Sequence, residues 1–150
     1  MHLKLPPLFI ALITCVLMYF LALFLPFGVF DFTGKKYMMF FLLGLGCLLE
    51  GFSLFQFFFK KTTISPISPD NASTLVVNGI YNFTRNPMYL GMLLLLLAFG
   101  LYLGNAFNIL VAAGFVSYMN NFQIIPEEEA LEKKFGEAYK NYRIKVRRWF

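Results

Sequence analysis

Two long apolar runs without any Lys or Arg constrain this chain more than any other feature. They extend from Leu8 to Leu25 and from Tyr37 to Phe59. A bilayer core about 30 Å thick is crossed by roughly 20 apolar residues in a helix, so both runs predict transmembrane helices. Two further runs, Met88 to Leu103 and Ala106 to Ile125, are separated by Gly104-Asn105, a pair typical of a helix end and turn. They predict a tight helical hairpin.

The composition argues against a water-soluble fold. Hydrophobic residues make up 59% of the 150 residues and charged residues only 14%, so most of the surface must be apolar. The 20 Phe and eight Tyr add more apolar area than a soluble chain of this length can bury. We therefore expect an all-α integral membrane protein with four transmembrane helices and a C-terminal amphipathic cytosolic helix. Residues 1–59 would form an N-terminal helical pair, and residues 60–150 one folding unit of loop, hairpin and C-terminal helix.

Basic residues are distributed unevenly between the two sides of this expected bundle. Of the 13 Lys and Arg, only Lys35 and Lys36 fall on the side away from the termini, which leaves eleven on the other side. Positive residues favour the cytoplasmic side, so a multi-pass protein with both termini cytoplasmic is predicted. The net charge of +5 then follows from topology and from contact with membrane lipids, and nucleic acid is not expected as a partner. The cytoplasmic segment Lys60 to Pro87 is rich in Pro, Asn and Gly and is typical of an ordered loop.

Residue counts exclude several familiar kinds of site. His2 is the only histidine, which excludes histidine triads and multi-histidine metal sites. Cys15 and Cys47 both lie in apolar runs, so neither a disulfide framework nor a zinc site is expected. The sequence contains no GxGxxG or Walker-type phosphate loop. No metal site is therefore predicted.

Glu50 is an ionisable residue near the middle of the second apolar run. Such a side chain costs on the order of 3 kcal/mol to insert, so it should face the bundle interior or a wet cavity. One interpretation is a carboxylate that binds protons or a ligand. The other is a hydrogen-bonded packing residue beside the small neighbours Gly46 and Cys47. The sequence leaves both open.

The segment from Gly79 to Gly91 combines helix-start signals with groups that bind anions. Pro87 suits the first turn of a helix and Asn86 the capping position before it, and glycine permits close backbone approach. The same stretch adds a cation and two aromatic hydroxyls: Arg85, Tyr81 and Tyr89. A guanidinium beside free helical N–H groups favours a carboxylate ligand. Interfacial tyrosines and an arginine anchor are the alternative interpretation.

The C-terminal segment opens with three acidic residues after Pro126. Acids in a first helical turn complement the helix dipole, which is one sufficient explanation. Glu127 and Glu128 also lie four and three residues before Leu131, at the edge of the apolar face, and can turn inward to hold hydroxyls or a cation. Apolar positions then recur at helical spacing: Leu131, Phe135, Ala138, Tyr139, Tyr142 and Val146. This pattern predicts one amphipathic helix.

Together these segments resemble the isoprenylcysteine carboxyl methyltransferase family, within the wider group of membrane phospholipid methyltransferases. The first segment carries Gly79-x-Tyr81-x-x-x-Arg85-Asn86-Pro87-x-Tyr89-x-Gly91. The second carries Glu127-Glu128-x-x-Leu131-x-x-x-Phe135-Gly136-x-x-Tyr139-x-x-Tyr142-x-x-x-Val146-x-Arg148-Trp149. The resemblance covers about Thr62 to Phe150, whereas the first two spans match only as apolar helices.

The resemblance implies methyl transfer from S-adenosylmethionine, with S-adenosylhomocysteine as product, to a lipophilic acceptor that arrives from the bilayer. It implies a cofactor site made by Tyr81, Arg85, Asn86, Pro87, Tyr89, Gly91, Glu127, Glu128 and Tyr139, and catalytic roles for Arg85 and Arg148. Two positions depart from the family pattern, since Asn86 stands where many members have His and Arg147 where the tail has Pro.

The acceptor class divides the remaining hypotheses. A carboxylate, as on an isoprenylcysteine, is ionised at neutral pH and needs no general base, so it is the favoured acceptor. A phospholipid amine would have to lose a proton, and the single histidine at the amino terminus is poorly placed for that. Two alternatives lie outside that choice: a small proton-coupled exporter that uses Glu50, and a structural membrane protein that has lost activity.

Overall fold

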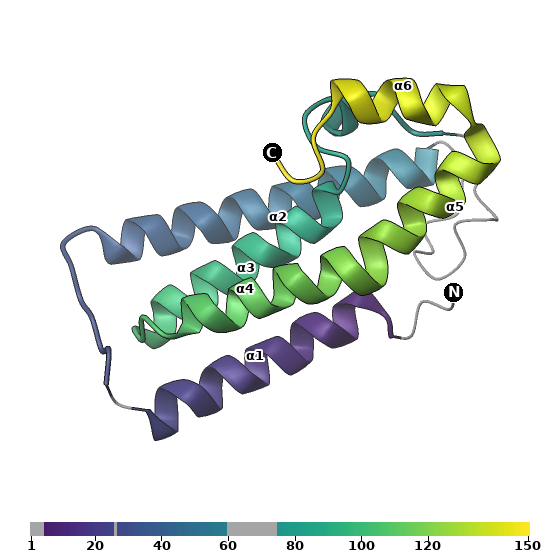
Figure 1. Ribbon diagram of the computed structural model, residues 1–150. Coiled ribbons are helices and arrows are strands. Elements are labelled where there is room, and N and C mark those ends of the chain that lie inside the picture. Colours follow the sequence, from purple (N-terminus) through teal and green to yellow (C-terminus); the bar gives the residue numbers. More distant parts are fainter. Residues whose placement is uncertain (1–4, 26, 60–74) are drawn as a thin grey trace.

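The protein is a bundle of helices that lie side by side along most of their length (Figure 1). The computed structural model describes residues 5–25, 27–59 and 75–150. The elements are α1 (Pro7–Phe24), α2 (Lys35–Phe59), the 3-10 turn η2 (Gly79–Asn82), α3 (Pro87–Leu103), α4 (Asn108–Met119), the π-helical turn η3 (Asn120–Ile124), α5 (Ile125–Phe135) and α6 (Glu137–Lys145). Over the described ranges, β-type pairing is limited to one bridge, between Val29 and Asn105.

Three of the described helical segments are long and apolar enough to cross a membrane. They are Pro7–Phe24, Lys35–Gln56 and the continuous stretch Asn108–Phe135, while α3 is apolar but shorter. The expected all-helical membrane architecture is therefore confirmed. The first half of the predicted cytoplasmic loop, residues 60–74, lies outside the described residues.

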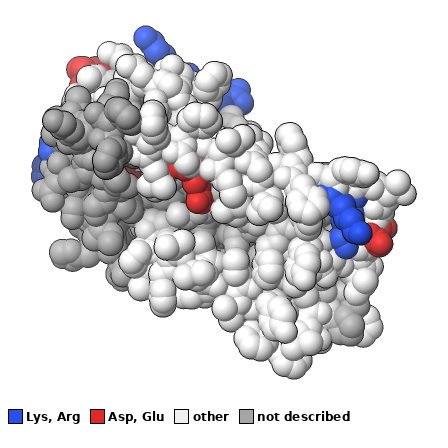
Figure 2. All heavy atoms as spheres, turned by 180° about the vertical axis from the view of Figure 1, so that it is seen from behind, with Lys and Arg blue, Asp and Glu red and all other residues white. Residues whose placement is uncertain are grey.

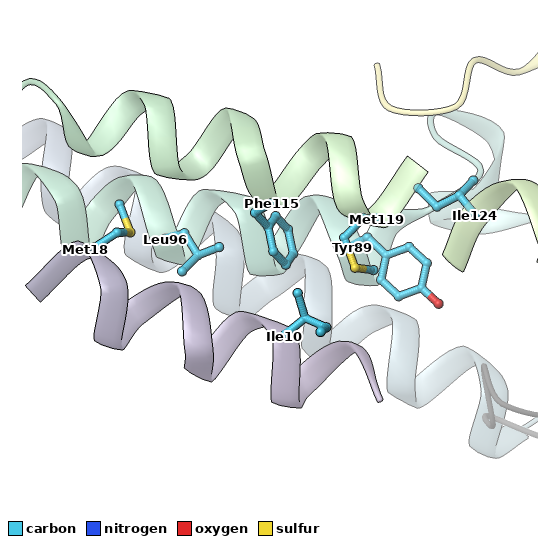
Figure 3. Close-up of a cluster of buried hydrophobic side chains, with 7 residues drawn as sticks. All are labelled: Ile10, Met18, Tyr89, Leu96, Phe115, Met119 and Ile124. Carbon is cyan, nitrogen blue, oxygen red and sulfur yellow. The ribbon is translucent and has the colours of Figure 1, made fainter. Parts of the chain in front are cut away.

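The packed interior lies between α1, α3 and the α4–η3 segment, where seven buried side chains form one cluster (Figure 3). Its members are Ile10, Met18, Tyr89, Leu96, Phe115, Met119 and Ile124. Most large apolar side chains of α1 and α2 point outward instead, among them Phe41 and Leu48. The face drawn in Figure 2 is mostly uncharged, with one acidic group near its middle and the other charged side chains toward the two ends. Such a surface suits lipid contact.

Helices α2 and α3 approach each other closely because two glycines meet between them. A Cβ atom on Gly91 would lie 2.7 Å from Glu50 Cγ and 3.1 Å from the Gly46 carbonyl oxygen. A Cβ on Gly46 would lie 3.0 Å from Leu95 and 3.1 Å from the Gly91 oxygen. Small residues allow this kind of backbone approach in membrane helix pairs. Glu50 consequently packs against the first turns of α3.

We expect Gly91→Ala to lower the apparent melting temperature of the purified protein. Alanine normally stabilises a helix relative to glycine by about 1 kcal/mol, but overpacking against α2 costs roughly 1–3 kcal/mol. Gly114→Ala is the matched control, because nothing lies within 4 Å of a Cβ placed there. The apparent melting temperature should therefore fall in Gly91→Ala and rise in Gly114→Ala. Equal stabilisation of both variants would contradict the close α2–α3 contact.

The helical hairpin predicted at Gly104-Asn105 is present. Gly104 has φ 67° and caps α3, a left-handed conformation that glycine adopts without strain. The Asn105 amide Nδ2 donates to the Leu25 carbonyl at 2.7 Å, and Asn105 Oδ1 accepts from the Phe107 N–H at 3.0 Å. The hairpin turn is thus tied to the end of α1.

The C-terminal segment differs from the single amphipathic helix expected from its periodicity, and that expectation is wrong. The described chain has two helices there, which meet at Gly136 with φ 53°. Buried side chains after the break, Tyr139, Tyr142 and Val146, pack against residues 75–81. Ala138, expected on the apolar face, is exposed. The turn at Gly136 reorients the second helix so that its tyrosines reach that partner.

The break expected between the apolar run Ala106 to Ile125 and the C-terminal segment is also absent. The helix continues from α4 through η3 into α5, although Pro126 has no N–H to donate. A proline ring clashes with the carbonyl four residues earlier in a regular α-helix. The wider π turn that precedes Pro126 relieves this clash, and π turns of this kind recur at functional sites.

Candidate active site

The site residues expected from sequence meet at one end of the bundle, where the start of α3, the start of α5 and the segment after α6 converge (Figure 1). Pro87, Tyr89 and Gly91 lie in the first turns of α3 and are buried. Tyr81 is buried in η2, and Tyr139 is buried in α6. Tyr81 and Tyr139 belong to the same buried cluster, whereas Tyr89 belongs to the cluster between α1, α3 and α4.

Glu128 is the centre of a buried ionic cluster. Its Oε1 atom accepts from Arg85 Nη2 at 2.9 Å and from Arg148 Nε at 3.1 Å, while its Oε2 accepts from Arg148 Nη2 at 2.7 Å. The side chains of Arg85 and Glu128 are each 9% exposed, and that of Arg148 is 33% exposed. Hydrogen bonding to Glu128 raises the pKa of the Arg148 guanidinium, which keeps it charged. One carboxylate thus joins cations from two segments.

Glu127 has a different environment one residue earlier. Its Oε1 accepts a 2.6 Å hydrogen bond from the Tyr89 hydroxyl and a 2.8 Å hydrogen bond from the Gln123 amide. Both donors are neutral groups, whereas the partners of Glu128 are cations. The two neighbouring acids are therefore held inward by separate sets of bonds, and neither behaves as a solvated first-turn charge.

The last turn of α6 and the backbone after it are hydrogen-bonded to Arg85 and to the loop before α3. Arg85 N donates to the Arg147 carbonyl at 3.0 Å, and Arg85 Nη1 donates to the Arg143 carbonyl at 2.9 Å. The Arg148 carbonyl accepts from Thr84 Oγ1 at 3.2 Å and from Asn86 Nδ2 at 3.0 Å. Asn86 does occupy the capping position of α3, but its amide bonds the tail rather than a helical N–H. The guanidinium of Arg85 retains one buried donor, Nε, with no partner among the described atoms.

A group of tyrosines covers this polar cluster. The Tyr142 hydroxyl donates to the Tyr81 carbonyl at 2.7 Å, and the rings of Tyr139 and Tyr142 meet edge to face at 6.1 Å. Burial raises the pKa of the Tyr81, Tyr139 and Tyr142 hydroxyls, so all three remain neutral at physiological pH. Their rings supply electron-rich faces that attract cations.

Three side-chain contacts in this region were not predicted from the sequence. Gln123 holds Glu127, and its i, i+4 spacing from that residue was the available signal. Trp149 donates from Nε1 to Asn120 Oδ1 at 2.9 Å, which anchors the tail to the π turn. Gln56 donates to the Asn78 carbonyl at 3.0 Å, and its side chain fills the space that a Cβ on Gly79 would need. No local pattern marks the last two contacts.

Comparison with known families shows which family the chain belongs to. A family model described as phospholipid methyltransferase matches residues 36–138, more than half of the chain. The chain belongs to the phospholipid methyltransferase family. The match begins at the start of α2, so the family relationship extends over the second span, which the motif resemblance alone did not include. It ends before Tyr139 and Arg148.

Two relatives give further context. The chain is 52% identical over 62 residues to an uncharacterized protein of Haemophilus influenzae. This match covers 41% of the chain and 98% of that protein. It is also 35% identical over 72 residues to the protein-S-isoprenylcysteine O-methyltransferase of Schizosaccharomyces pombe. That match covers 48% of this chain and 30% of that enzyme. No solved structure matches. The resemblance to the isoprenylcysteine methyltransferase branch is confirmed, and the chain is a membrane methyltransferase by family.

Proposed function

We propose that this protein transfers the methyl group of S-adenosylmethionine to the carboxylate of a lipophilic acceptor, in the manner of an isoprenylcysteine carboxyl methyltransferase. The observation that carries the proposal is the pair of inward carboxylates at the start of α5. Glu127 is held by Tyr89, and Glu128 is held by Arg85 and Arg148. Family membership and the yeast relative support the same reaction.

The residues at this end fit such a cofactor chemically. S-adenosylmethionine combines a sulfonium, an amino group, a carboxylate and ribose hydroxyls, and it supplies the transferable methyl group when bound. Carboxylates accept from amino and hydroxyl groups, and tyrosine rings attract a sulfonium by cation–π interaction. The buried Arg85 Nε, which has no partner among the described atoms, is a donor for an anionic oxygen.

Methyl transfer is an in-line displacement, so we assign the protein's residues mainly to positioning and to exclusion of water. Glu127 and Glu128 would orient the cofactor from α5, and Tyr139 would shield its charged region. Arg85 and Arg148 would fix the geometry of Glu128 and present positive charge toward an acceptor carboxylate. No residue has to remove a proton, because the acceptor carboxylate is already ionised at neutral pH.

The experiment is calorimetric titration of the purified protein with S-adenosylhomocysteine, followed by transfer of labelled methyl to lipid acceptors. We expect binding, and we expect the label in a base-labile ester when an isoprenylcysteine is offered. The description of the family as phospholipid methyltransferases favours a second candidate, an amine-directed enzyme, in which the label would enter a headgroup amine. Proton flux without cofactor binding would instead indicate a transporter that uses Glu50, and would overturn the proposal.

We also propose four spans, with the shorter α3 as the third, and both termini in the cytoplasm. The two helices that flank the hairpin turn place the start of α3 and the α5 segment at the same end of the bundle (Figure 1). The excess of Lys and Arg on that side supports a cytoplasmic location.

We expect tags at the two ends of the chain to be equally protected from external protease in intact cells. A tag in the loop of residues 27–34 should be cleaved under the same conditions, which provides the accessible control. Cleavage of either terminal tag would contradict the orientation, and with it delivery of a cytosolic cofactor to this end.

A further inference from the structure

Three large apolar side chains near the C-terminal end of the chain are almost fully exposed although they lie outside the candidate spans. Ile144 is 83% exposed, and Phe83 and Phe150 are each 79% exposed. Their segments are neighbours in space, because Thr84, which follows Phe83, donates from Oγ1 to the Arg148 carbonyl at 3.2 Å. We call these three side chains the apolar patch. Exposed apolar groups gathered in one region indicate an interaction surface.

Two cations accompany the apolar patch without an acid to neutralise them in the part of the chain that the structure describes. Lys145 and Arg147 both have exposed side chains. The other basic residues after Gly136 are each paired with an acid: Lys140 with Glu137, Arg143 with Glu132, and Arg148 with Glu128. Lys145 follows Ile144 directly, and Arg147 precedes Phe150 by three residues. Free positive charge and apolar surface therefore occur together in this stretch.

The position of α6 along the bundle indicates what this stretch faces. Tyr142 of α6 donates to the Tyr81 carbonyl at 2.7 Å, and the Tyr81 side chain hydrogen-bonds that of Ser53 in α2. Ser53 lies three residues before Gln56, where the apolar span in α2 ends. Helix α6 therefore lies beside the last turn of a membrane span and not beyond it, and the C-terminus is directed back along the bundle (Figure 1). The headgroup layer of a bilayer surrounds that part of a span.

We propose that residues 144–150 and Phe83 dock into the headgroup layer of the bilayer leaflet at this end of the bundle, with the apolar patch among the upper acyl chains and Lys145 and Arg147 at lipid phosphates. Long basic side chains reach phosphates while their stems stay in apolar surroundings. Apolar area and positive charge together hold interfacial segments on anionic membranes. Lipid fits better than a soluble protein partner, because this surface lies at the side of a span. The surface is separate from the methyl-transfer site.

Fluorescence quenching of the full chain in phospholipid vesicles tests the apolar contact. A fluorophore is attached at Ile144→Cys, in a background that carries Cys15→Ala and Cys47→Ala. Glu137→Cys in the same background is the matched control, because Glu137 is an exposed residue at the other end of α6. We expect lipids with a nitroxide high on the acyl chain to quench the label at 144 at least threefold more than the label at 137. Iodide, a water-soluble quencher, should show the reverse order. Equal quenching of both labels by the lipids, or stronger iodide quenching at 144, would overturn the proposal.

A second measurement tests the charged contact. The apparent melting temperature is compared in nanodiscs of phosphatidylglycerol and of phosphatidylcholine with the same chains, and we expect the anionic lipid to raise it for wild type. Lys145→Gln combined with Arg147→Gln should remove at least half of this rise. Lys145→Arg combined with Arg147→Lys preserves both charges and should retain it. The proposal is overturned if wild type shows no rise, if the double Gln variant keeps the full rise, or if the charge-preserving variant loses as much as the double Gln variant.

Discussion

Glu128→Gln is expected to lower the apparent melting temperature by roughly 6–20 °C and to abolish measurable binding of S-adenosylhomocysteine. The substitution removes the only negative partner that the structure describes for Arg85, whose side chain is 9% exposed. Breaking a buried ion pair from one side costs about 3–5 kcal/mol, because the remaining charge stays buried without compensation. Arg148, which bonds both oxygens of Glu128, would lose its partner at the same time.

Glu129→Gln is the matched control for this result. Glu129 follows Glu128 in the same helical turn but is exposed, so its loss should change stability by no more than the few tenths of a kcal/mol expected for a helix-dipole charge. Adding Arg148→Gln to Glu128→Gln should recover part of the lost stability, since one uncompensated charge is removed. If Glu128→Gln and Glu129→Gln behave alike, the ionic cluster does not hold this end of the protein together.

Arg85→Lys is expected to insert and fold, yet to lose at least tenfold in methyl transfer, about 1.4 kcal/mol of transition-state stabilisation. The Arg85 guanidinium reaches Glu128 and the Arg143 carbonyl from two different nitrogens. A lysine ammonium is a single point charge on a flexible stem and cannot span both acceptors in a fixed geometry. The measurement is the rate of labelled methyl transfer to a prenylated carboxylate, with cofactor and acceptor each varied.

Arg147→Lys provides the control, because Arg147 is in the tail, carries an exposed side chain and interacts with Arg85 only through its carbonyl. It should retain wild-type turnover. A loss confined to cofactor affinity in Arg85→Lys would place its effect on the cofactor, and a loss confined to acceptor saturation would place it on the substrate. Wild-type turnover in Arg85→Lys would reduce Arg85 to an anchor for the tail.

The parts of the fold that depend on local signals follow from the sequence. α1 begins and ends within one residue of the predicted run, and α3 begins at Pro87 and ends at Leu103 before Gly104. Apolar runs, proline and left-handed glycine are read from a few neighbouring residues. The turn at Gly136 was not predicted, because the helical periodicity of the apolar residues continues across it. Its cause is a contact with residues more than fifty positions earlier.

In the candidate site, too, local spacing predicts some features and distant contacts determine the others. Inward acids at the start of α5 could be inferred from their spacing to Leu131, and Glu127 and Glu128 both point into the protein. Arg85, by contrast, was expected to be available for a ligand carboxylate, whereas two of its nitrogens bond Glu128 and the tail backbone. Spacing within a helix predicts which face a side chain occupies, but it does not indicate which charge from a distant segment will neutralise it.

The hydrogen bonds between the Thr84–Asn86 loop and the carbonyls of Arg147 and Arg148 have a consequence for the order of biosynthesis. Apolar helices can enter the membrane as they leave the ribosome, and all residues through α4 are made before the tail. The ionic cluster cannot close until Arg148 has been synthesised and has reached Glu128. A nascent chain that has already inserted its helices therefore still lacks the complete cluster, and the site cannot close before Arg147 and Arg148 reach the Thr84–Asn86 loop.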